Sequence, residues 1–226
     1  MLNSHTMTTP TTEPSAKRKP RPRARDSKEI LLGIAAKLFR DFGYNATSIR
    51  DIVKRAKIEP SALYYHYSSK EALLDAVLER SIHNVMMEVR EAVEKLPANA
   101  DSRDRITAGI ARHLRSIHIH GDFALASRRV IGEIPAALRR KHDAMRAEYG
   151  AYWESLFQDA AASKGIREDV RLGLARMFLM GALNWSSEWF DPKKKSPEDV
   201  AEIFCGILFD GLSPKSLSTG KRPRLQ

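Results

Sequence analysis

The chain has 226 residues, which is enough for one large or two small domains with a buried core. Cys205 is its only cysteine, which excludes an internal disulfide framework and favours the reducing cytoplasm, and no apolar run approaches the roughly 20 residues that a membrane-spanning helix needs. The formal net charge is +10, and the distribution of this charge along the chain is more informative than its total.

The excess charge is concentrated near the N-terminus. Six cations and no anion stand between Lys17 and Arg25, interleaved with prolines. A segment of this composition does not fold alone, so we expect residues 1–26 to be a disordered basic arm. It is either a solubilising tail or an arm that follows DNA phosphates or enters a minor groove. We also expect a disordered tail over 214–226.

Three amphipathic stretches follow in close succession and predict helices over about 28–43, 48–56 and 60–67. Gly43 supplies a left-handed stop for the first, and either Thr47 or Ser48 can cap the second. Pro60 suits the first turn of the third. Short helices with tight turns behind a basic arm are typical of a helix-turn-helix, which predicts a DNA-binding domain over 27–74.

A long fourth helix is expected to connect this module to the remainder of the chain. Ser68 and Glu71 have the spacing of a capping box, and apolar residues continue at helical spacing to about Leu96, before Pro97. A helix of this length would belong to both domains. It is therefore the expected mechanical link between them.

Helical periodicity persists to the end with no alternating strand pattern, so the predicted fold class is all-α with nine helices. The later helices are expected around 106–117, just after Asp122, and over 138–162, 168–190 and 197–212. Gly165 is the expected stop of the third of these, and Ser196 the expected cap of the last. Residues 75–213 would form a ligand-binding and dimerisation domain.

The N-terminal segment resembles the TetR family of repressors over roughly residues 28–75. The resemblance is carried by TSIRDIVKRA at 47–56, IEPSALYYHY at 58–67 and SKEALL at 69–74. It implies a TetR-like fold and a dimer that reads a near-palindromic operator. Lys57 departs from the family, which commonly has glycine in this turn, so the turn must either use a right-handed backbone or tolerate strain.

The resemblance also implies roles for individual residues. Thr47 and Ser48 would offer a hydroxyl and helix-start N–H groups to one phosphate, and Tyr64 and Lys70 would hold others. Arg50 would add a further contact. The residues expected at base edges or the adjoining backbone in the major groove are Ser61, Ala62, Tyr65 and His66. Tyr67 occupies a position that usually belongs to the core.

In the same family the last two helices of each subunit pair with those of a partner. The residues expected at this homodimer interface are Val200, Ile203, Phe204, Ile207 and Leu208. Cys205 is expected to pack in this seam, where a thiol ionises poorly, although a redox switch is the alternative interpretation.

A second resemblance covers GALNWSSEWFDP at 181–192, followed by Ser196-Pro197-Glu198 and Gly211-Leu212. It is similar to a branch of the family that answers to fatty-acyl or steroid-derived acyl-CoA thioesters. Arg128 and Arg129 would either meet an acidic group of such an effector or merely pair with acidic residues at the surface. The expected lining of an apolar cavity is Phe123, Trp153, Phe178, Asn184 and Trp185, each of which is equally compatible with ordinary core packing.

The two resemblances together predict a ligand-responsive transcriptional repressor. Two other functions are the alternatives. An enzyme is disfavoured because none of the common nucleotide-binding, metal-binding or hydrolase motifs occurs. The histidines at 113, 118 and 120 do not share one helical face, so neither a metal site nor a cofactor is expected. An architectural DNA-binding protein is suggested by the charge, but it would not need a large aromatic C-terminal domain.

Overall fold

The structure is a computed structural model that describes residues 24–211. Within that range all regular structure is helical, which confirms the all-α class. The elements are α1 (Ala24–Phe42), α2 (Ile49–Ala56), α3 (Pro60–His66), α4 (Lys70–Glu94), α5 (Ser102–Ile119), α6 (Gly121–Arg129), α7 (Ala136–Ala162), α8 (Leu172–Asn184), α9 (Ser186–Trp189), α10 (Pro197–Cys205) and the π-helical turn η1 (Gly206–Asp210).

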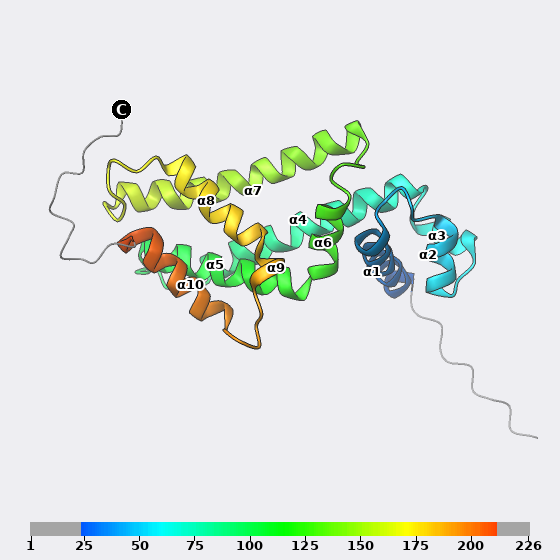
Figure 1. Ribbon diagram of the computed structural model, residues 1–226, viewed down its shortest axis with the longest axis horizontal. Helices are drawn as coiled ribbons and strands as arrows, with labels where there is room; N and C mark the ends of the chain where they lie inside the picture. Colours follow the sequence, from blue (N-terminus) through cyan, green and yellow to red (C-terminus); the bar gives the residue numbers. More distant parts are fainter. Residues whose placement is uncertain (1–23, 212–226) are drawn as a thin grey trace, which may run out of the picture.

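Figure 1 shows α1, α2 and α3 as a separate group at one end of an elongated body. Helix α4 runs from this group into the body, as expected for the long connecting helix. The predicted C-terminal tail and most of the predicted basic arm lie outside the described residues. Because α1 begins at Ala24, the last residues of that predicted arm belong to a helix instead.

Particular residues form the turns between the helices of the N-terminal group. Gly43 has φ +84°, and a Cβ there would lie 2.6 Å from an Oε1 of Glu133. Ser48 caps α2 in a reciprocal capping box with Asp51. Lys57 adopts the left-handed conformation with φ 56° and ψ 45°, so the strained alternative is the one the turn uses.

Two helix ends differ from prediction by one residue. Ser69, not Ser68, is the N-cap of α4, and its hydroxyl accepts from the Ala72 N–H at 3.0 Å. The expected pairing of Ser68 with Glu71 was therefore wrong in register. At the end of α7 the left-handed residue is Lys164, with φ 58°, while the Gly165 N–H closes the turn onto the Ala160 carbonyl at 2.8 Å.

The predicted count of nine helices was wrong because two long helices are interrupted. The helix expected over 168–190 breaks at Trp185 into α8 and α9, and Arg128 contacts the residues at this break. The Arg128 guanidinium lies 4.6 Å from the centre of the Trp185 ring and donates to Ser187 and Glu188. The last helix leaves α-helical geometry after Cys205 and ends in η1.

Two hydrophobic cores hold the described residues together. One lies between α1, α2, α3, the first half of α4 and α6, and the other between the second half of α4, α5, α7, α8 and α10. Ala126, Val130 and Ile134 from α6 and the loop after it are buried in the first core. Packing therefore does not stop at the predicted domain boundary after residue 74, because α6 also belongs to the N-terminal group.

Candidate functional site

Helix α3 presents one polar and aromatic face to solvent. Tyr65 is 80% exposed and Tyr64 52%, and Ser61 and Ala62 are exposed beside them. The opposite face is fixed by Leu63, which is completely buried. A short helix with its inner face locked and its outer side chains free can enter a groove of a nucleic acid without rearrangement.

His66 and Tyr67 complete this helix in different ways. The His66 ring is partly exposed and meets the Tyr65 ring edge to face, with 5.0 Å between centroids. Tyr67 is 5% exposed, which confirms its predicted place in the core. Burial raises the pKa of its phenol to about 12, so it stays neutral.

The start of α2 differs from the predicted phosphate clamp. The Thr47 side chain is only 3% exposed, and its hydroxyl donates to the Gly43 carbonyl at 2.7 Å. Ser48 is exposed, but Asp51 accepts both its backbone N–H, at 2.9 Å, and its hydroxyl, at 2.5 Å. The structure therefore places Thr47 in the scaffold of the module, and it leaves Arg50 exposed at this helix start.

Lys70 lies at the first turn of α4, where its ammonium sits 4.2 Å from the centre of the Tyr44 ring. Partial burial lowers the pKa of this amine. The aromatic ring holds the cation in place near the reading helix, a position compatible with its predicted phosphate contact.

A group of cations for which no role was predicted surrounds the turn between α2 and α3. Lys54, Arg55 and Lys57 are all exposed there. The signal was present as the run KRAK at 54–57. Exposed cations beside a reading helix would strengthen binding to any polyanion in a salt-dependent way.

A cavity of about 340 Å³ lies within the helical body. Its walls come from α4, α5, α6, α7 and α8, and combine aliphatic side chains such as Ile82, Val85 and Met180 with three arginines, Arg128, Arg146 and Arg176. No acidic residue lines it, although each arginine pairs with a carboxylate outside the wall. The arginine side chains are between 27% and 37% exposed, so each is partly accessible to solvent.

Two of the six predicted ligand residues, Arg128 and Asn184, line this cavity. The other four do not. Trp153 is completely buried in the core against Gly109, whereas Phe178 is 67% exposed on α8. Trp185 is exposed beneath Arg128, and Phe123 lines a neighbouring cavity.

His113 and Tyr149 line the cavity and were not predicted. The imidazole Nδ1 lies 2.8 Å from the Tyr149 hydroxyl, and the rings stack with 5.9 Å between centroids. Burial lowers the pKa of His113 to about 3 and raises that of the Tyr149 phenol. Both groups are therefore neutral near pH 7, which makes them a hydrogen-bonding pair rather than a charged one.

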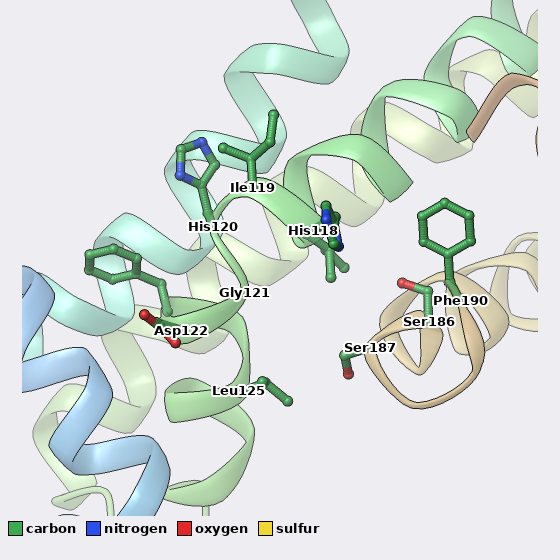
Figure 2. Close-up of a pocket in the computed structure, with 11 residues that line it drawn as sticks. His118, Ile119, His120, Gly121, Asp122, Leu125, Ser186, Ser187 and Phe190 are labelled. Atoms are coloured by element: carbon green, nitrogen blue, oxygen red, sulfur yellow. The ribbon is translucent and has the colours of Figure 1, made fainter. Parts of the chain in front are cut away.

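A second cavity of about 350 Å³ lies where α5 turns into α6. Figure 2 shows His118, Asp122 and Leu125 on one side and Ser186, Ser187 and Phe190 on the other. It shares the residues Ile117 and Ser187 with the first cavity. The three histidines of this region do not cluster. His113 is buried, His118 is exposed, and the Nε2 of His120 lies 2.9 Å from an Oε1 of Glu88. In the part of the chain that is described, no three potential metal-ligating residues come together.

Comparison with known proteins finds a family model for the N-terminal module and another for the helical body. A family model described as "Bacterial regulatory proteins, tetR family" matches residues 31–77, and one described as "Tetracyclin repressor-like, C-terminal domain" matches residues 99–212. The chain belongs to the TetR family. The resemblance seen in the sequence is thereby confirmed, and the family consists of transcription regulators.

Individual relatives agree along most of the chain. The transcriptional repressor KstR2 of Rhodococcus jostii is 27% identical over 185 residues, which cover 81% of this chain and 89% of the relative. The TetR family regulator PfmR of Thermus thermophilus superposes with a TM-score of 0.71 at 25% identity, covering 81% of this chain and 99% of PfmR. AibR, solved in complex with isovaleryl coenzyme A and operator DNA, shares the fold with a TM-score of 0.69 at 23% identity, covering 81% of this chain and 98% of AibR.

The TetR-like body also carries an apolar surface on α8, α9 and α10. Its exposed members are Leu174, Met177, Phe178, Trp185, Trp189 and Ile203. Of the predicted interface residues, Ile203 is exposed and Phe204, Ile207 and Leu208 are partly exposed. Val200 was placed wrongly, because it is 5% exposed and packs in the core of its own chain.

Cys205 is completely buried, and its sulfur accepts from the Thr107 hydroxyl at 3.0 Å. Burial raises the pKa of its thiol, which agrees with a packing role. Among the described helices, none is long and apolar enough to cross a membrane.

Direct contacts join the N-terminal module of this TetR-family chain to α6. Asp122, at the start of α6, accepts a hydrogen bond from the Arg40 guanidinium and lies 3.9 Å from the Lys37 ammonium. The Glu133 carboxylate, after α6, accepts from the Asn45 N–H at 2.5 Å. Because Asp122 also lines the second cavity, the first turn of α6 touches both a cavity and the DNA-binding module.

Proposed function

We propose that this protein is a ligand-responsive transcriptional repressor. It binds a palindromic operator as a dimer and is released by a small hydrophobic acid carried as a coenzyme A thioester. The observation that carries this proposal is the arginine-lined apolar cavity, whose walls include α4 and α6, the same two helices that pack into the core of the DNA-binding module.

The DNA-binding part rests on the exposed face of α3. Ser61, Ala62, Tyr65 and His66 would contact base edges and the adjoining backbone, and Tyr64, Lys70, Arg50 and the exposed Ser48 would contact phosphates. The cations of the turn at 54–57 would add sequence-independent affinity. Thr47 would act as a scaffold residue, because its hydroxyl is occupied inside the module.

The dimer part rests on the apolar surface of α8, α9 and α10. Six large hydrophobic side chains exposed on one region are typical of an interface. A single module of three short helices covers about one half-site, so two copies related by a two-fold axis would be needed for useful affinity.

The effector part rests on the size and charge of the cavity. Its volume of about 340 Å³ is at the lower end of the range for small-molecule sites and would hold a short acyl group or a small ring system, but not a whole coenzyme A. The nucleotide would remain outside, where Arg128, Arg146 and Arg176 could meet its phosphates. AibR, with the same fold, was solved with isovaleryl coenzyme A.

The release mechanism requires two conformations with different distances between the reading helices of the dimer. An effector shifts the equilibrium only if it binds one conformation better than the other. Since α4 and α6 contribute to both the cavity and the module, filling the cavity would favour the conformation in which the two α3 helices no longer match successive major grooves. A repressor that binds operator DNA would work in the cytoplasm, where bacterial DNA lies.

Selection of DNA fragments by the purified protein, followed by binding measurements, tests the proposal. We expect one near-palindromic sequence to bind at least about 1,000-fold more tightly than random DNA at physiological salt. Replacing both Tyr65 and His66 by alanine should remove most of this preference, while replacing the exposed Lys95, at the far end of α4, by alanine should leave it intact. Equal affinity for all sequences would instead support an architectural DNA-binding protein.

A further inference from the structure

His113, in the wall of the first cavity, carries a hydrogen-bonding atom that no group within residues 24–211 satisfies. His113 is 1% exposed and lines the cavity from α5. Its Nδ1 is bonded to the Tyr149 hydroxyl, but its Nε2 has no hydrogen-bond partner among the described residues. A buried polar atom without a partner costs free energy, so an atom of this kind in a cavity wall points to a ligand.

The hydrogen bond to Tyr149 indicates which role the free nitrogen plays. The 2.8 Å contact joins His113 Nδ1 to the Tyr149 hydroxyl, and either atom can donate across it. We infer that Tyr149 donates, because the opposite direction would leave its buried hydroxyl proton unused as well as His113 Nε2. A neutral imidazole whose Nδ1 accepts a hydrogen bond carries its proton on Nε2. The cavity wall therefore offers an N–H donor, and its complement is an oxygen that accepts.

The surroundings restrict the kind of oxygen. Ile82, Val85 and Met180 make this part of the lining apolar, and the arginines are partly exposed and paired with carboxylates. A carboxylate bound beside the neutral imidazole would lose its hydration without gaining a compensating charge. An uncharged carbonyl oxygen gains a hydrogen bond at a much lower desolvation cost.

We propose that His113 selects effectors whose acyl part carries a ketone or similar uncharged carbonyl oxygen at a fixed distance from the thioester. This inference rests on the proposed function, because it deepens the identity of the ligand in the same cavity. It makes the site bipartite, with arginines for the phosphates of the nucleotide and a single neutral donor for an oxygenated acyl group. Plain acyl thioesters of equal length would fit but would leave Nε2 unsatisfied.

Titration of the full-length protein with a matched set of thioesters tests this. The set is octanoyl-CoA and its 3-, 4-, 5-, 6- and 7-oxo derivatives, and calorimetry gives the affinity of each. We expect one oxo isomer to bind the unaltered protein about 10-fold more tightly than octanoyl-CoA, which is the size of effect of one buried hydrogen bond. The His113→Phe variant should lose this preference while still binding octanoyl-CoA.

A matched control is available on the same helix. His118 lines the second cavity and is exposed, so His118→Phe should keep the preference for the oxo isomer. If His113→Phe fails to fold, the affinities of the unaltered protein for octanoyl-CoA and its oxo derivatives still test whether the cavity prefers a carbonyl oxygen. Equal binding of octanoyl-CoA and all oxo isomers would overturn the inference and leave the proposed function standing, whereas absence of binding by every thioester would remove both.

Discussion

Lys57 has a strained backbone conformation within an otherwise well-packed helix-turn-helix. The turn between α2 and α3 needs a left-handed backbone, and a lysine there has φ 56°. The left-handed conformation costs an L-residue with a Cβ roughly 1–2 kcal/mol, because the Cβ comes close to the following carbonyl. The sequence indicated that this position was unusual but left open which backbone it would adopt.

Replacing Lys57 by glycine should therefore stabilise the protein by about 0.5–1 kcal/mol. The relief of strain exceeds the entropy that glycine adds to the unfolded chain, which is roughly 0.4–1 kcal/mol. Urea denaturation of the two proteins measures the difference. Lys54→Gly, inside α2, is the control and should instead lose about 1 kcal/mol. A destabilised Lys57→Gly variant would show that the turn is not strained.

His113 couples the cavity wall to the pH dependence of stability. Its pKa in the folded protein is about 3, below the ordinary value of 6.5, because burial disfavours the charged form. Between these values the unfolded chain binds a proton that the folded chain does not. The stabilising contribution is therefore complete above pH 6.5 and is lost as the pH falls toward 3.

We expect the free energy of unfolding to fall more between pH 7.5 and pH 5.0 in the unaltered protein than in His113→Phe. The difference should be about 2 kcal/mol, since roughly 1.5 pH units below 6.5 each contribute about 1.4 kcal/mol. Comparing the two proteins cancels the contribution of His142, whose pKa burial also lowers. Parallel pH profiles would mean that His113 is protonated in the folded state.

At the scale of elements, helix starts were more predictable than helix packing. Ser48, Pro60 and Ser196 mark their helices through local capping chemistry that depends on a few neighbouring residues. At the break, Arg128 contacts Trp185 and Ser187, which lie nearly sixty residues later in the chain, and no local pattern reports these contacts. The packing of α6 against α1 was missed for the same reason.

Helix α6 joins α4 as a link between cavity and DNA-binding module. The sequence pointed to α4 alone because length and periodicity identify a helix shared by two domains. The ion pair of Asp122 with Arg40 and the bond from Asn45 to Glu133 add a second connection. Such contacts bias the module only if α6 has two arrangements that the effector distinguishes.

Asp122→Asn should weaken the effector's influence on operator binding. Removing the charge loosens α6 from α1, so we expect the ratio of operator affinities without and with effector to fall about 3-fold or more. Fluorescence anisotropy of labelled operator measures both affinities. Glu91→Gln, which removes an exposed ion pair with Lys95 on α4, is the control and should leave the ratio unchanged. An unaltered ratio in Asp122→Asn would exclude this connection from the mechanism.

At the scale of the whole molecule, the class of fold and the reading helix were predictable, and the cavity was not. Periodicity and short motifs determine helices and a helix-turn-helix, and the exposure of Ser61, Ala62, Tyr64 and Tyr65 agrees with the roles that the family resemblance implied for them. The cavity depends on how five helices converge. Large aromatic residues such as Trp153 and Phe178 could not be assigned from sequence, and they lie in the core and on the surface respectively.

The apolar surface of α8, α9 and α10 predicts a dimer that depends on Phe178. Phe178→Glu would place a charge on that surface, where desolvation is costly, and should convert the dimer to monomers. Light scattering coupled to size exclusion gives the mass. Phe42→Glu, which alters an exposed aromatic residue on α1, should leave the dimer intact. A dimeric Phe178→Glu variant would place the interface elsewhere.

The most direct test of the account is the affinity of the dimer for its selected operator as a thioester is added. Occupation of the arginine-lined cavity should weaken binding to that operator by 5- to 150-fold, the usual range of coupling between sites, and should leave weak binding to random DNA nearly unchanged. An affinity for the operator that stays constant while calorimetry shows the thioester bound would contradict the account.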